Sequence, residues 1–148
     1  MSKLKVLNSL FSELGVINDV LTSEMHEEIN GAKELSFTTI LTPMVANLIN
    51  DTNIVEHDGD YYDIAAYKKS QYEKDLRLDV ECEHVSYRLN NEEYNIEYFT
   101  EIGTPSEILA KILNGTGFTV GTVQFSDTVT YSAQEAKSRR GLLMEFAV

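Results

Sequence analysis

Hydrophobic and polar positions alternate from Val16 to Ile40, and this pattern predicts a β-hairpin. Alternate residues of a strand point to opposite faces. One face is therefore predicted to be apolar and to hold Ile17, Leu21, Met25, Ile29, Leu35 and Phe37. A two-residue turn at Asn30-Gly31 would split this set, whereas a turn of three residues (30–32) or five residues (30–34) keeps it on one face. We therefore predict an odd-length turn with Gly31 at positive φ.

A second hairpin is predicted around Asp58-Gly59, a favoured pair for a two-residue type I′ turn. Such a turn sets Val55 opposite Tyr62. With regular alternation, one face of the following strand then holds Tyr62, Ile64 and Ala66.

The next strand is predicted to run from Leu76 to Leu89. Its apolar positions at first have even numbers, and they are Leu76, Leu78, Val80 and Cys82. From Val85 onward the apolar residues have odd numbers, which predicts a β-bulge or a bend near His84. Bends of this kind close small barrels.

Helix signals appear at three places. Thr42-Pro43 is a cap followed by a first-turn proline, and Thr104-Pro105 repeats that pattern with Glu107 completing a capping box. Asn114-Gly115 ends the second helix. Ser138 begins a third helix that is still running at the last residue of the sequence, so we expect an N-terminal fragment of a longer protein. Further short strands are predicted at residues 3–7, 94–102, 118–125 and 129–133.

The order of these elements predicts an α+β fold that is mainly β. Residues 1–92 are expected to form a bent antiparallel sheet or a small β-barrel. Residues 93–148 are expected to begin a smaller, incomplete α/β domain.

The chain has 148 residues with a net charge of −12. This charge disfavours binding to nucleic acid phosphates, which requires Lys and Arg clusters, and to anionic membranes. No apolar run approaches the roughly 20 residues that a membrane-spanning helix needs, and the N-terminus lacks the features of a signal peptide. Synthesis in the cytoplasm is therefore expected. The lone Cys82 excludes an intrachain disulfide, and we expect it to be buried.

Candidate catalytic groups are sparse. The three histidines lie on three different predicted strands and lack metal-site spacing; they are His26, His57 and His84. Asp58, Asp60 and Asp63 resemble a calcium loop only superficially, because no Glu closes the run at the twelfth position. The sequence holds no G-x-S-x-G elbow and no Walker-type loop. We therefore expect no catalytic residue, cofactor or metal in this chain.

Arg139 and Arg140 are adjacent at the start of a predicted helix, where the helix dipole disfavours positive charge. A carboxylate within the chain or on a neighbouring subunit would explain the pair, and a solvated pair is the alternative. We keep both as candidates for an intersubunit contact.

Four segments in this order resemble the N-terminal region of phage tail hub proteins, also called tail-associated or prophage endopeptidase tail proteins. The segments are EEINGAKELSFTT, the Asp58–Tyr62 hairpin, VECEHVSYRLNN and GTPSEILAKILNGTGFTVG. The resemblance implies a barrel followed by a smaller α/β domain. It also implies three copies in a ring of pseudo-sixfold symmetry at the tail tip, between the distal tail protein and a spike, receptor-binding or lytic part. Any enzymatic part of the family lies in a C-terminal half that this chain lacks.

The resemblance implies a structural hub protein of a phage or prophage tail, which assembles as a homotrimer. DNA would pass through the ring without specific binding, beside the acidic residues Glu24, Glu28, Asp79, Glu81 and Glu83. The central hub of another contractile injection machine is an alternative. A tail-associated peptidoglycan hydrolase or peptidase is an alternative of another class, and an adhesion module that binds host surface sugars is a third.

Overall fold

The computed structural model describes residues 2–133 and 137–146. The chain divides into two compact units, Met1–Val85 and Ser86–Val148. The boundary thus lies seven residues before the expected 92/93. The difference arises because most of the 3₁₀ helix η1 (Val85–Asn90) belongs to the second unit.

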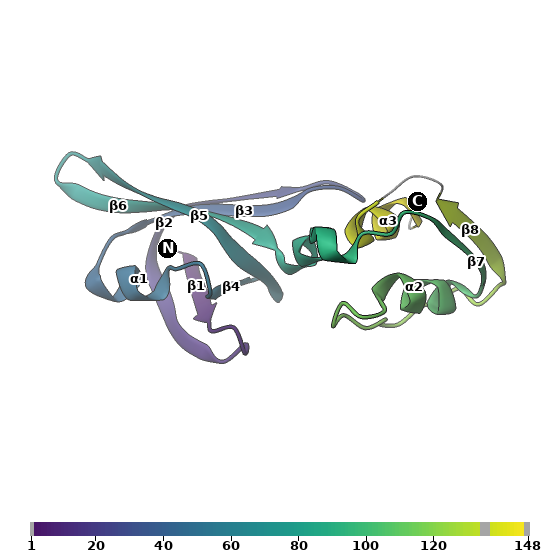
Figure 1. Ribbon diagram of the computed structural model, residues 1–148. Coiled ribbons are helices and arrows are strands. Elements are labelled where there is room, and N and C mark those ends of the chain that lie inside the picture. The colour runs from purple at the N-terminus through teal and green to yellow at the C-terminus, as the bar shows by residue number, and fades with distance from the viewer. Residues whose placement is uncertain (1, 134–136, 147–148) are drawn as a thin grey trace. The chain divides into compact units, whose positions relative to one another are not determined.

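The first unit is a closed antiparallel barrel in the order β1-β2-β3-β6-β5-β4 (Figure 1). Its elements are β1 (Ser2–Leu7), β2 (Glu13–Glu27), β3 (Lys33–Ile40), α1 (Pro43–Leu48), β4 (Ile54–His57), β5 (Asp60–Tyr72) and β6 (Asp75–His84). The expected mainly β class with an N-terminal barrel is confirmed.

Strand β2 pairs with two neighbouring strands along different parts of its length. Its first half, Glu13–Val20, pairs with β1, and its second half, Val20–Glu27, pairs with β3. The core of the barrel is almost entirely apolar, and its largest fully buried side chains include Leu4, Ile17, Leu35, Val55, Tyr62 and Val80.

The β2–β3 turn has the predicted odd length, since Met25 pairs with Leu35. The Glu28 amide donates to the Ala32 carbonyl at 2.8 Å, so residues 29–31 form the turn rather than 30–32 or 30–34. The prediction of positive φ at Gly31 is wrong, because Asn30 adopts that conformation at 55°. Asn tolerates left-handed backbone better than most residues.

The predicted apolar face of this hairpin is only half buried. Ile17, Leu35 and Phe37 are in the core, but Leu21, Met25 and Ile29 are exposed. The register shifts between Val20 and Thr22, which removes Leu21 from the core-facing series, and β2 beyond this point is exposed along its whole length.

The Asp58-Gly59 turn is confirmed, with φ of 49° and 80° at its two residues and Val55 paired with Tyr62. The placement of Ala66 beside Tyr62 and Ile64 is wrong. A register shift between Ile64 and Ala66 turns Ala66 to the outer face and leaves it exposed.

Strand β6 keeps Leu78, Val80 and Cys82 buried, as predicted, whereas Leu76 is exposed. The strand ends at His84, and the predicted continuation to Leu89 is wrong. The apolar residues after His84 instead belong to η1, which buries Leu89.

The second unit contains η2 (Glu92–Tyr94), β7 (Phe99–Gly103), α2 (Pro105–Leu113), β8 (Val129–Ala133) and α3 (Arg139–Phe146). The capping box of α2 is present as predicted, with both Thr104–Glu107 hydrogen bonds formed. Strand β7 covers only the end of the predicted 94–102 strand, and residues 118–125 form no strand. The expected run of α3 to the end of the sequence lies outside the described residues.

Candidate functional surface

The outer faces of β2, β3, β6 and β5 form one surface with an excess of carboxylates. Residues paired across these strands point to the same side of the sheet. In one row His26 pairs with Glu34, Glu34 with Glu83, and Glu83 with Asp63. We call this surface the acidic face, and its carboxylates are Glu24, Glu28, Glu34, Asp63, Asp79, Glu81 and Glu83.

Two further rows of paired residues on this face combine carboxylates with short side chains and Lys68. Glu24 pairs with Ser36, which pairs with Glu81, and Asp79 lies between Thr38 and Lys68. The short side chains leave a groove of about 660 Å³ along this face, and a second groove of about 390 Å³ adjoins it and shares Glu24, Ser36 and Glu81.

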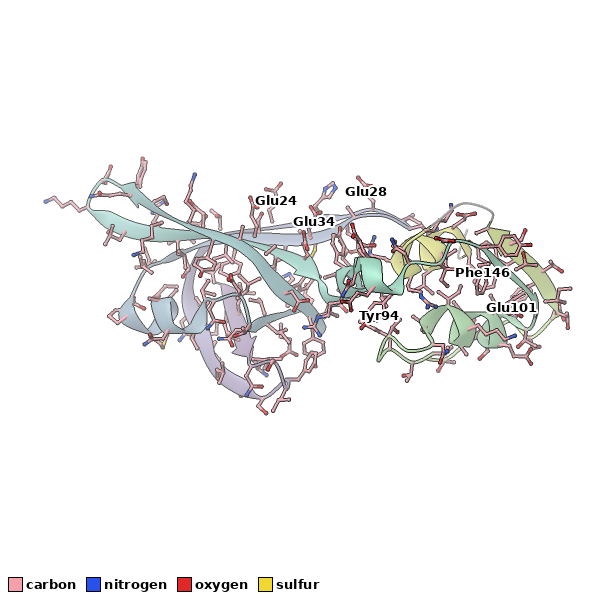
Figure 2. The ribbon with its side chains drawn as sticks, in the orientation of Figure 1. Glu24, Glu28, Glu34, Tyr94, Glu101 and Phe146 are labelled. Carbon is pink, nitrogen blue, oxygen red and sulfur yellow. The ribbon has the colours of Figure 1, made fainter. Side chains whose placement is uncertain are left out.

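All five acidic residues named from the sequence belong to this surface. Glu24, Asp79, Glu81 and Glu83 project from the strands, and Glu28 follows at the end of β2, where its Oε1 lies 3.2 Å from Nε2 of His26. Figure 2 shows Glu24, Glu28 and Glu34 on the β2–β3 hairpin.

Sequence reasoning missed Glu34 and Asp63. The alternation of Glu34 with the buried Leu35 contained the signal for the first. The pairing of β5 with β6, which brings in Asp63, has no local signal in the sequence.

Like charges that lie directly opposite each other in a sheet destabilise it. The Glu34–Glu83–Asp63 row therefore carries an electrostatic cost. Asp79 is compensated, because the Thr38 hydroxyl donates to its Oδ1 at 2.7 Å and lowers the pKa of its carboxyl. The excess of carboxylates gives this face a negative electrostatic potential.

A separate ion-pair cluster joins three strands at one end of the barrel. Asp60 Oδ2 accepts from Lys33 Nζ at 2.5 Å, and its Oδ1 lies 3.4 Å from His84 Nε2. The hydrogen bond to Lys33 lowers the pKa of Asp60 and raises that of Lys33. Asp60 thus contributes to the hairpin and the barrel end, in agreement with the hairpin interpretation of this segment.

The remaining titratable candidates are dispersed. His57 lies 3.4 Å from Asp58, its own neighbour in the turn. Within residues 2–133 and 137–146, no group of three or more His, Cys, Asp or Glu side chains is placed to hold a metal ion. Burial raises the pKa of the Cys82 thiol to about 12, so it is a poor nucleophile.

The two arginines make contacts within the chain. Arg139 Nε donates to the Tyr94 carbonyl at 2.5 Å, and its Nη1 donates to the carbonyls of Ile112 and Lys111 at 2.8 and 3.3 Å. Arg140 Nε is 3.2 Å from Ser86 Oγ, and its guanidinium lies 4.2 Å from the centre of the Tyr87 ring. A contact with a neighbouring subunit stays a prediction.

Helices in the described part of the chain are all too short or too polar to cross a bilayer.

Comparison with known proteins agrees with the resemblance seen in the sequence. A family model described as the prophage endopeptidase tail N-terminal domain matches residues 4–84, which is nearly the whole barrel. The crystal structure of prophage tail protein gp18 from Listeria monocytogenes EGD-e superposes with a TM-score of 0.67 at 14% identity, covering 98% of this chain and 45% of that one. This chain therefore spans less than half the length of that protein. No curated protein sequence matches the chain.

Proposed function

Because the chain belongs to the prophage endopeptidase tail N-terminal domain family, we propose that this phage tail domain is a structural part of the hub at the tail tip. The hub joins the tail tube to the distal spike, receptor-binding or lytic part. The observation that carries this proposal is the family match over residues 4–84, which coincides with the barrel.

The proposed assembly is a homotrimer that contacts the distal tail protein on one side and the distal module on the other. Arg139 and Arg140 are candidate contacts to a neighbouring subunit, although their contacts within the chain already account for their positions. The assembly would form in the host cytoplasm and remain in the virion tail.

Labelling of intact tails tests the position. Fab fragments raised against the purified chain should decorate the tail tip in negative-stain electron micrographs of the particle that carries this protein. Decoration along the tube, or at the head-proximal end, would contradict a hub role.

The acidic face is proposed to line or flank the channel through which DNA passes. A row of carboxylates repels the phosphate backbone and would keep DNA from adhering during ejection. Replacing Asp79 and Glu81 with Lys should slow genome ejection without unfolding the domain.

Two acidic residues outside this face, Glu13 and Asp51, are exposed and provide a matched control. Their replacement with Lys changes the net charge in the same direction but leaves the acidic face intact. Equal ejection rates in both sets of variants would contradict the channel role.

An enzymatic role is the alternative from a different class, and the family description, which contains the word endopeptidase, is what favours it. A peptidoglycan zymogram of the purified chain distinguishes the two, because a structural hub domain leaves the gel opaque. The hub of another injection machine is distinguished by the neighbouring genes.

A further inference from the structure

In the described part of the barrel unit, one half of β2 and one half of β5 each have a strand partner on one side alone. Strand β2 pairs with β1 only up to Val20, so residues 21–27 have a partner on the β3 side alone. Strand β5 pairs with β4 only over Asp60–Asp63, so residues 64–72 have a partner on the β6 side alone. Across residues 2–133 and 137–146, no backbone hydrogen bond outside these pairings reaches residues 21–27 or 64–72. Such edges are templates for pairing with another chain.

The two edges belong to opposite sides of one four-stranded sheet, β2-β3-β6-β5. Every neighbouring pair in it is antiparallel, so β2 and β5 run in opposite directions. A second copy placed beside the first, with its strand directions kept, would therefore bring its β2 antiparallel to β5. The sheet can continue from copy to copy without any change of orientation.

The charges of the two edges are complementary. The free half of β2 and the turn after it carry Glu24, Glu27 and Glu28. By contrast, the free half of β5, which leads into the β5–β6 hairpin, carries Lys68 and Lys69 and no acidic residue. The tip of this hairpin extends past α1 in Figure 1. Lysine on an edge strand ordinarily discourages pairing, but here the opposite edge of the same sheet is acidic.

We propose that a second copy of this chain docks by this edge, with its β2 (residues 22–26) pairing antiparallel to β5 (residues 66–70). Placing Glu24 opposite Lys68 joins opposite charges on the outer face. The same register sets Met25 opposite Tyr67 on the other face, and these side chains are 36% and 45% exposed in the single chain. Opposite-charge and apolar cross-strand pairs both stabilise a sheet.

This interface is heterologous, because two different edges meet, so repetition gives a ring when the rotation closes and a filament otherwise. It rests on the proposed hub function, for which it supplies the contact between copies. It also differs from an isologous dimer, in which one patch would meet itself.

Disulfide trapping on the full chain tests the register. In a Glu24→Cys/Lys68→Cys variant, the two new thiols of one chain lie three strand spacings apart, about 14 Å, which is beyond the reach of an intrachain bridge. Oxidation at high protein concentration should therefore give a ladder of covalent dimers, trimers and larger species. Thr22→Cys/Lys68→Cys and His26→Cys/Lys68→Cys are matched controls, displaced by about 7 Å along the strand, and should give at most about a tenth of the ladder. The parent chain, whose only thiol is the buried Cys82, should give none.

A charge exchange tests the recognition. Glu24→Lys/Glu27→Lys and Lys68→Glu/Lys69→Glu should each reduce the ladder about tenfold when combined with trapping at the apolar pair, Met25→Cys/Tyr67→Cys. All four charge changes in one chain should restore it. No ladder at any of the three registers, or a four-fold variant no better than its parents, overturns the proposal.

The trapping assay tests edge pairing and tail labelling tests the hub role, so their outcomes are independent. A labelled tail tip without any ladder would refute edge pairing and leave the hub role intact. A register-specific ladder without tip labelling would refute the hub role and leave edge pairing intact.

Discussion

Replacing Arg139 with Ala tests how the second unit is held together. The Arg139 guanidinium donates to the Tyr94 carbonyl and to two carbonyls at the end of α2, those of Lys111 and Ile112. It therefore connects the start of α3 to η2 and to the negative end of the α2 dipole. The unfavourable position of this cation at the N-terminus of its own helix is offset by a favourable position at the C-terminus of another.

The expected loss follows from these three hydrogen bonds. A hydrogen bond from a charged group contributes about 1.5–3 kcal/mol. The bonds share one half-buried group, and water can replace some of them in the variant, so we expect Arg139→Ala to cost about 2–4 kcal/mol. Small domains have about 5–15 kcal/mol in total. Arg139→Lys keeps the charge but loses the planar fork, and we expect roughly half of that loss.

Hydrogen exchange measured by mass spectrometry resolves the two units separately. The amides of α2 and α3 should exchange faster in Arg139→Ala, while those of β3 and β6 keep the exchange rates of the parent. Arg140→Ala is the matched control, because it removes the neighbouring arginine, which contacts Ser86 and the Tyr87 ring, and should cost about 1 kcal/mol or less. Equal exchange in the two variants would refute the reasoning.

Three other expectations concern the barrel. Asp60→Asn should cost about 0.5–1 kcal/mol of unfolding free energy near pH 7, since the carboxyl paired with Lys33 is 45% exposed. Because the pKa of Asp60 is lowered from 3.8, this stability is present above pH 3.8 and is lost as the pH falls through the folded-state pKa. The urea midpoints of parent and variant should therefore converge at that low pH. Glu83→Gln should raise the urea midpoint by the equivalent of about 0.5 kcal/mol at low salt, because it removes a like charge facing Glu34, and an unchanged midpoint would contradict the repulsion. Cys82 should react with a thiol reagent only after unfolding, and fast labelling of the native chain would contradict its burial.

Local structure could be predicted from the sequence where a few adjacent residues determine it. The Asp58-Gly59 turn and the Thr104 capping box were predicted because each depends on backbone bonds within a few residues. The bulges near Leu21 and Ala65 were not predicted, because they depend on how distant strands pair rather than on local pattern. They explain why Leu21 and Ala66 lie outside the core.

The acidic face was predictable only where it depends on local alternation along one strand. Strict alternation on β6 placed Asp79, Glu81 and Glu83 on one side of the strand. Which strands stand beside β6 depends on long-range pairing, so the direct opposition of Glu83 to Glu34 and Asp63 needed the structure.

The salt dependence of ejection connects the acidic face to the distance of DNA from the sheet. Charge repulsion extends over about one Debye length, roughly 8 Å at physiological ionic strength and 3 Å at 1 M salt. If the carboxylates act on passing DNA, slower ejection by the Asp79→Lys/Glu81→Lys variant should be greatest at low salt. The difference from the parent should largely disappear near 1 M. Fluorescence release of a DNA-bound dye from triggered particles measures the rate, with the Glu13→Lys/Asp51→Lys chain as reference. A defect that persists at 1 M salt would indicate an altered assembly rather than an electrostatic effect on DNA.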